Sequence, residues 1–131
     1  MRTPRSATGH RGSAAVEFAL VLPLVLVVVL GLVQVGLLTR DRLLVEAAAR
    51  AGARAAALGP DLLEIQATAL QAAPGLDPAR ATVEVNRVGT RGEPVEVRVA
   101  YAAAVRVPLV DWLIGSEVDM ATTAVARQEF G

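Results

Sequence analysis

A long apolar run, Phe18 to Leu38, constrains this chain more than any other feature. Within it only Gln34 is clearly polar, so the segment has no polar face that could lie in water. A helix rises about 1.5 Å per residue, so the run spans about 30 Å, the thickness of the hydrocarbon core of a bilayer. A core helix in a chain of only 131 residues is the alternative, and it explains the run poorly. We therefore predict a transmembrane helix over residues 13–38.

Residues 1–12 precede this run as a short basic leader. They include Arg2, Arg5 and Arg11 but no acidic residue, and their composition gives them no reason to fold. The leader resembles the n-region of an export signal. A cleaved secretory signal peptide is the rival interpretation, but its apolar region would be only about 7–15 residues long. Arginines also follow the run: Arg40, Arg42, Arg50 and Arg54. The arginine count alone therefore does not set the orientation.

Glu17 stands at the entrance of the apolar run. A carboxylate within a bilayer is costly, so an ionisable residue there is a functional candidate by default. The alternative is that Glu17 lies at the headgroup boundary, or near the first helical turn, where the helix dipole favours a negative charge. The residues alone leave both interpretations open. Pro23 follows and removes a backbone hydrogen bond, which transmembrane helices tolerate.

The string Gly12-Ser13-Ala14-Ala15-Val16-Glu17-Phe18 resembles the processing site of type IV pilin-like proteins. The longer string GSAAVEFALVLPLVLVVVLGL is similar to the TadE-like pseudopilins of tight-adherence (Flp) pilus systems. The strong resemblance covers residues 11–36. The string EAAARAGARAAA at 46–57 is a weaker match, and the ending AVARQEF also looks similar.

The resemblance implies roles for the residues around the leader junction. A prepilin peptidase would cut after Gly12 and make Ser13 the new N-terminus. Glu17, the fifth residue of the mature chain, would pair with the terminal amine of a neighbouring pilin subunit, and Phe18 is the aromatic residue that often follows it. The resemblance and the lack of acidic residues in the leader favour a cytoplasmic N-terminus and an extracytoplasmic domain, in the cell membrane or on a surface pilus.

Beyond the run, we predict that the helix continues from Thr39 to about Leu58. Small apolar residues recur there at helical spacing: Leu43, Ala47, Ala51 and Leu58, widened by Leu44, Ala48 and Ala55. Glu46 and Arg50 are spaced for an ion pair on the polar face. Alanine buries little area, so this face should pack closely against a neighbour. Gly59-Pro60 should end the helix.

The rest of the sequence, together with the continued helix, predicts a small α+β domain over residues 39–131. A shorter helix should run from Asp61 to Ala73, with Asp61 in its first turn and one apolar face: Leu62, Ile65, Ala69 and Ala73. The pattern then alternates with period two, which predicts antiparallel strands at 81–86, 95–107 and 118–127. About three strands packed on the long helix would give a pilin-like fold, which is near the minimum for independent stability.

The composition favours no enzyme. The chain has no cysteine, one histidine and a formal net charge of zero, and it lacks a glycine-rich phosphate loop and paired metal-binding histidines. We expect no cofactor, metal, small-molecule substrate or nucleic-acid partner. Asp111, Glu117 and Asp119 form a loose acidic group that we interpret as a solvated loop, with weak calcium binding as the lesser alternative. We expect Trp112 to be exposed or half-buried and to anchor the small core, with a platform for a ligand as the lesser alternative. Tyr101 should lie within that core.

Two functions fit these features. The first is a minor pilin or pseudopilin that takes part in assembly of a tight-adherence pilus or related secretion apparatus, with the membrane, a prepilin peptidase and other pilins as partners. The alternative is an unprocessed single-pass membrane protein whose outer domain binds a protein partner.

Overall fold

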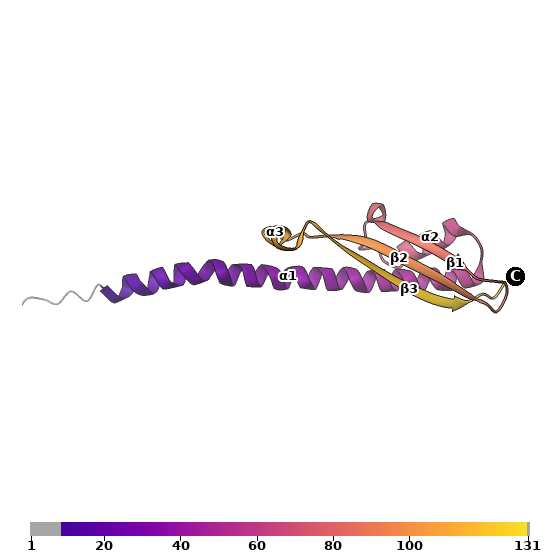
Figure 1. Cartoon of the computed structure of the whole chain (residues 1–131), viewed down its shortest axis with the longest axis horizontal. Coiled ribbons are helices and arrows are strands. Elements are labelled where there is room, and N and C mark those ends of the chain that lie inside the picture. The colour runs from indigo at the N-terminus through magenta and orange to yellow at the C-terminus, as the bar shows by residue number, and fades with distance from the viewer. Residues whose placement is uncertain (1–8, 131) are drawn as a thin grey trace, which may run out of the picture.

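A computed structural model describes the backbone of residues 9–130 and the side chains of residues 12–130. Its first element, α1 (Gly9–Leu58), is one continuous helix that contains Pro23. Figure 1 shows α1 running along the whole molecule, with all other elements beside its C-terminal half. The predicted long helix is confirmed. The helix begins inside the predicted leader, however, so residues 9–12 are helical where no fold was expected, and the rest of the leader lies outside the described residues.

The sheet has three antiparallel strands, as predicted. They are β1 (Ala81–Arg87), β2 (Pro94–Ala104) and β3 (Glu117–Arg127), in the spatial order β1-β2-β3. Val83 lies opposite Val99 in the first pair of strands, which places the valine faces of the two strands in register. The second strand ends at Ala104 and not at Val107 as predicted, because the chain leaves the sheet there to contact α1.

Three short helices complete the fold. They are α2 (Leu62–Gln71), the 3-10 helix η1 (Pro78–Arg80) and α3 (Val110–Ile114). Asp61 caps α2, because its Oδ1 accepts hydrogen bonds from the backbone N–H of Leu63 at 2.9 Å and of Glu64 at 3.4 Å. Ile65 and Ala69 are buried as predicted, but Leu62 faces solvent. The loop after β2 was predicted as a plain connection, and α3 is the helix within it.

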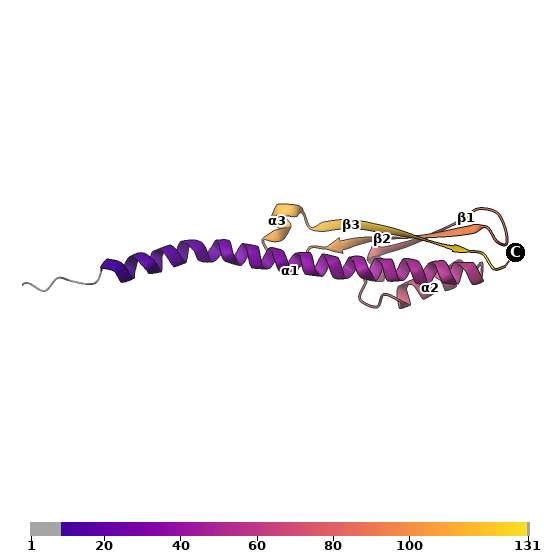
Figure 2. The same ribbon diagram turned by 90° about the horizontal axis from the view of Figure 1, so that it is seen from below.

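The core lies between one face of the sheet and two helices. Figure 2 shows the sheet on one side of the molecule with α1 and α2 beneath it. Alternate residues of β2 point into this layer and are buried: Val95, Val97, Val99, Tyr101 and Ala103. The expectation that Tyr101 belongs to the core is confirmed, and its hydroxyl accepts a hydrogen bond from the backbone N–H of Asp77 at 3.4 Å.

The buried face of α1 differs from the predicted one. Its members are small and lie against the sheet and α2: Val45, Ala48, Ala49, Gly52, Ala53, Ala56 and Ala57. Leu43 and Leu58, which the sequence placed at the two ends of the face, are exposed instead. The close packing expected of an alanine face is present, but the face is rotated around the helix from its predicted position.

The carbonyls at the C-terminal end of α1 are bonded by Arg87 of β1 and by Glu129 near the end of the chain. Arg87 donates hydrogen bonds to the carbonyl oxygens of Ala56 and Gly59, both at 2.8 Å. The backbone N–H of Glu129 donates to the carbonyl of Ala57 at 2.8 Å. These partners satisfy carbonyls that a helix end leaves open. Arg87 also lies 5.1 Å from the centre of the Phe130 ring. The ending AVARQEF therefore fixes the far end of α1 to the sheet.

At Gly52 both α2 and the sheet approach α1 closely, so we predict that Gly52→Val destabilises the domain. A Cβ atom at this position would lie 3.0 Å from Val97 Cγ1 and 3.3 Å from Ala69 Cβ. Overpacking of this kind costs about 1–3 kcal/mol. The measurement is thermal unfolding of the detergent-solubilised chain.

Gly36→Val is the matched control, since a Cβ atom at Gly36 meets no atom within 4 Å. A lower Tm for the Gly52 variant alone is the expected result. Equal Tm values for both variants would contradict the close approach at Gly52.

Candidate functional site

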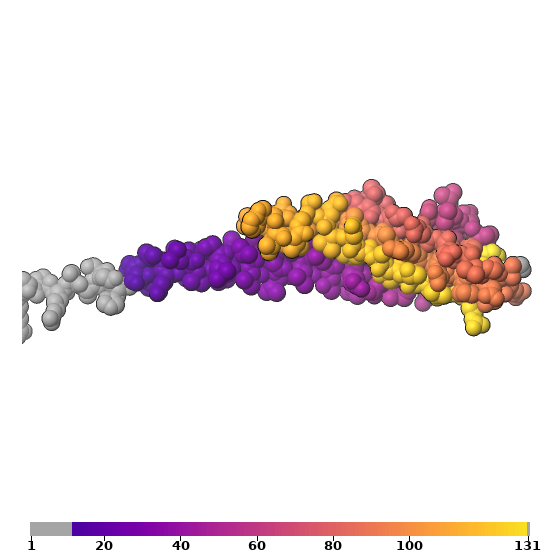
Figure 3. Space-filling model, in the orientation of Figure 1, coloured from indigo at the N-terminus to yellow at the C-terminus, as the bar shows by residue number. Residues whose placement is uncertain are grey.

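The N-terminal half of α1 is bare and apolar. Every residue from Gly12 to Val29 is exposed, and Figure 3 shows this segment projecting beyond the rest of the molecule. The helix from Gly12 to Leu58 has a window with mean hydropathy 2.8, and none of that window is buried in the structure. An apolar surface of this size is unstable in water. By length and composition α1 is therefore consistent with the helix of a single-pass membrane protein.

The predicted processing and pairing residues all lie on this bare segment. Gly12 and Ser13 are part of α1, and a Cβ atom built on Gly12 would meet no atom within 4 Å. Ser13 and Glu17 are four residues apart, so they lie on the same face of the helix, one above the other. Glu17 and Phe18 are exposed, and no other described side chain forms an ion pair with Glu17. These groups are therefore available to another molecule.

The structure reveals a second group of polar residues, centred on Gln34. The Gln34 side chain is only 1% exposed, although it lies within the predicted span. Its Oε1 accepts hydrogen bonds from the backbone N–H of Arg106 at 3.0 Å and of Val107 at 3.1 Å. Its Nε2 has no acceptor among the described residues. We call Gln34, Asp41, Arg106 and Val107 the clamp, because they hold the loop after β2 against α1.

Asp41 supplies the charge of the clamp. It is 1% exposed, and its carboxylate lies 3.7 Å from the guanidinium of Arg106 and 3.5 Å from that of Arg40. In the sequence Asp41 lies between Arg40 and Arg42, just beyond the apolar run. A signal for the clamp was present, because Gln34 is the single clearly polar residue in the apolar run. What could not be read from the sequence was its partner, which lies more than seventy residues along the chain.

The polar face of α1 beyond the clamp follows the predicted spacing. Glu46 lies between two arginines, 3.6 Å from Arg42 and 3.7 Å from Arg50, each four residues away along the helix. Such exposed pairs contribute only about 0.3–0.5 kcal/mol each. They stabilise the helix locally, and this face of α1 stays exposed to solvent.

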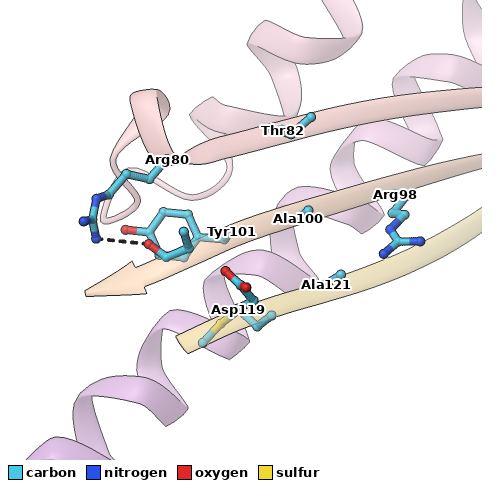
Figure 4. Close-up of a pocket in the computed structure, with 9 residues that line it drawn as sticks. Arg80, Thr82, Arg98, Ala100, Tyr101, Asp119 and Ala121 are labelled. Carbon is cyan, nitrogen blue, oxygen red and sulfur yellow. Dashed lines mark hydrogen bonds between the residues drawn. The ribbon is translucent and has the colours of Figure 1, made fainter. Parts of the chain in front are cut away.

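A shallow pocket of about 340 Å³ lies on the open face of the sheet, away from α1. Arg80 stands at its edge (Figure 4), where its Nη1 donates to the carbonyl of Ala102 at 3.1 Å and its Nη2 lies 2.6 Å from Glu117. Arg98 and Asp119 bring charges of opposite sign to the same surface. Arg80 already has partners, and the lining residues include no histidine or cysteine.

The next residues are the acidic group and the tryptophan in and after α3, for which the sequence made separate predictions. Asp111, Glu117 and Asp119 are exposed, and no group of three His, Cys, Asp or Glu within the described residues is placed to hold a metal. Trp112 was expected to anchor the core, and that expectation is wrong: its side chain is almost wholly exposed. The one buried residue of α3 is Val110, and the residue before it, Leu109, has a left-handed backbone.

Comparison with known proteins adds a family. The family model of TadE-like proteins matches residues 12–54, which begin at the predicted processing site and run almost to the end of α1. No curated protein and no solved structure matches the chain. The family match suggests a Tad pilus-related protein with a long apolar N-terminal helix, and it includes the bare segment, Gln34 and Asp41. Over these residues the chain is similar to TadE-like proteins.

Proposed function

We propose that this chain is a minor pilin or pseudopilin, without enzymatic activity, that takes part in assembly of a tight-adherence (Flp-type) pilus or a related secretion apparatus. The observation that carries the proposal is the bare apolar segment of α1, rigidly joined to a small sheet domain, within the residues that match the TadE-like model. A helix of this kind can hold the subunit in the bilayer before assembly. It can then pack against the helices of other subunits in a filament.

In this proposal a prepilin peptidase removes the leader by cutting after Gly12. The new amine at Ser13 and the carboxylate of Glu17 then lie one helical turn apart on the same face. That face carries both charges needed to pair with another subunit: its amine with a neighbour's carboxylate, or its carboxylate with a neighbour's amine. Pairing offsets the cost of holding an ionised group in an apolar environment.

The first test is the N-terminal sequence and intact mass of the protein recovered from its native membrane. A chain that begins at Ser13 supports prepilin-type processing. A chain that begins at Met1 overturns this part of the proposal, and it favours an unprocessed single-pass protein whose outer domain binds a partner.

Gly12→Asp is expected to block processing and leave the full-length precursor in the membrane. The residue has no neighbour within 4 Å that a larger side chain would meet, so the substitution acts on recognition by the peptidase and not on folding. The measurement is the mass of the membrane-bound protein in cells that carry the peptidase.

Gly9→Asp is the matched control, because it adds the same charge to the leader without altering the residue at the cut. The expected result is normal cleavage of the Gly9 variant and none of the Gly12 variant. Cleavage of both variants would show that Gly12 does not define the site.

A further inference from the structure

The loop around α3 presents a cluster of large apolar side chains to solvent. The exposed fractions are 61% for Leu109, 87% for Trp112, 69% for Leu113 and 48% for Ile114. We call these residues the apolar tip. Of α3, only Val110 is buried, so the tip contributes little to the core. Contiguous apolar surface of this kind marks a contact with another molecule or with a membrane.

The apolar tip lies directly beside the bare segment of α1. Figures 1 and 2 both show α3 at the end of the sheet domain that faces the projecting helix. The clamp fixes this position, since Gln34 holds the backbone of Arg106 and Val107 just before the tip. The side chains that flank Gln34 on α1, Val33 and Val35, are exposed and apolar. The apolar surface of α1 therefore continues into the tip.

The length of α1 sets the depth of the tip relative to a bilayer. Ser13 and Gln34 are separated by about 30 Å along the helix at about 1.5 Å per residue, which is the thickness of the hydrocarbon core. If the core begins at Ser13, it ends level with Gln34 and the tip meets the outer interface. If the core begins at Phe18 instead, the tip lies deeper. Both placements bring the tip into contact with lipid.

The backbone of Leu109 supports a role outside folding. Its φ of 73° lies in the left-handed region, which a non-glycine residue adopts only at a cost of about 1–3 kcal/mol. Glycine would remove that cost, yet the position carries a leucine with an exposed side chain. With 61% of its surface exposed, Leu109 buries little apolar area in the folded domain to offset this cost. Contact with lipid would bury more of its side chain.

We propose that the apolar tip is a second membrane contact, which inserts into the interfacial region of the outer leaflet beside α1. Tryptophan is enriched at this depth because its ring is apolar and its indole N–H can reach water or headgroups. The contact would fix the height and tilt of the sheet domain above the bilayer, and it must be released when the subunit leaves the membrane. This inference rests on the proposed membrane span of α1.

The test uses Trp112 itself, since it is the single tryptophan of the chain. The full-length protein is reconstituted at high dilution in phosphatidylcholine vesicles whose acyl chains carry bromine near the headgroup. Blue-shifted emission, quenching by the brominated lipid and loss of most quenching by aqueous acrylamide are expected. Emission typical of water, with full acrylamide quenching and none by the lipid, would overturn the proposal.

A matched control moves the tryptophan to the other end of the domain. Val88 is 59% exposed in the loop between β1 and β2, so Trp112→Phe combined with Val88→Trp should give water-like emission. Leu113→Ser with Ile114→Ser keeps the reporter and should reduce both the blue shift and the lipid quenching. Equal lipid quenching at positions 88 and 112 would show general adsorption of the domain and overturn the specific contact.

Two further results separate the possible causes of failure. Protection from acrylamide that appears only at high protein-to-lipid ratio, without quenching by brominated lipid, would identify a second subunit as the partner and overturn the lipid contact. Extraction of the chain from the vesicles by alkaline carbonate reports on α1. Resistance to extraction with Trp112 in water rejects the tip alone, whereas extraction rejects the membrane span on which both proposals depend.

Discussion

Glu17→Ala is expected to leave the chain inserted in the membrane but to prevent its co-assembly with other pilins. Removing the carboxylate makes α1 more apolar, so insertion should be at least as favourable as before. In the proposed assembly, however, the terminal amine of the neighbouring subunit would lose its partner. Loss of one partner from a buried ion pair should weaken association by about a hundredfold or more. Co-purification of the chain with pilus subunits measures this loss.

Two control variants separate charge from other effects of the substitution. Glu17→Gln keeps the size and polarity of the side chain but not its charge, so it should fail in the same way as alanine. Val16→Ala changes the adjacent exposed residue by a similar loss of volume and should assemble normally. Normal co-assembly of the Glu17→Ala variant would remove Glu17 from the proposed pairing and leave the family match intact.

The long helix could be predicted because its signals are local and strong. An unbroken apolar run needs no partner to be recognised, and the alternating valines after Ala81 needed only the pleat of a strand. The end of α1 at Gly59-Pro60 and the cap at Asp61 are likewise decided within a few residues. These parts of the fold follow from short-range chemistry, and the structure confirms them.

The buried face of α1 was misplaced because alanine gives a weak pattern. Residues 47–57 are so rich in alanine that several faces of the helix are equally apolar, and the spacing alone cannot choose among them. The choice is made by shape: Gly52 lets Val97 and Ala69 approach, and that contact sets the rotation of the helix. Such a fit depends on side chains from three elements, which the local sequence does not bring together.

Trp112 was misjudged for a related reason. A lone tryptophan in a small domain usually anchors the core. That expectation concerns the domain alone and does not consider a contact with a membrane. The clamp holds the loop after β2 against α1, yet Val110 is the one residue of α3 that is buried. The processing and pairing residues, by contrast, came from resemblance to a family, and they remain predictions that the experiments on Gly12 and Glu17 will test.

Gln34→Met is expected to detach the loop after β2 from α1 while leaving the sheet folded. Methionine preserves the length of the side chain but removes the acceptor shared by the backbone N–H groups of Arg106 and Val107. Val107 is buried, so its N–H would be left without a partner, and unsatisfied groups of this kind cost about 1–3 kcal/mol each. Arg106 is exposed and its N–H can bond to water, so we expect local destabilisation of about 1–3 kcal/mol, which comes mainly from Val107.

Hydrogen exchange measured on the full chain in detergent tests this expectation. Exchange of the Arg106 and Val107 amides should accelerate by more than about tenfold, since about 1.4 kcal/mol corresponds to a factor of ten. Amides in the centre of β2, such as that of Val97, should keep their protection. Val33→Met is the matched control, because it places the same side chain on the exposed position next to Gln34. Unchanged exchange in the Gln34 variant would contradict the clamp.

The charge of the clamp gives an independent second variant. Arg106→Met leaves the buried carboxylate of Asp41 with Arg40 as its remaining described partner, at 3.5 Å. Because Gln34 and Arg106 hold the same loop, the effects of the two substitutions should not add: once one has freed the loop, the other has less to lose. A double variant whose loss of protection equals the sum of the two single losses would mean that they act on separate elements. A loss smaller than this sum would show that Gln34 and the Asp41–Arg106 ion pair act together, as a single attachment between α1 and the sheet domain.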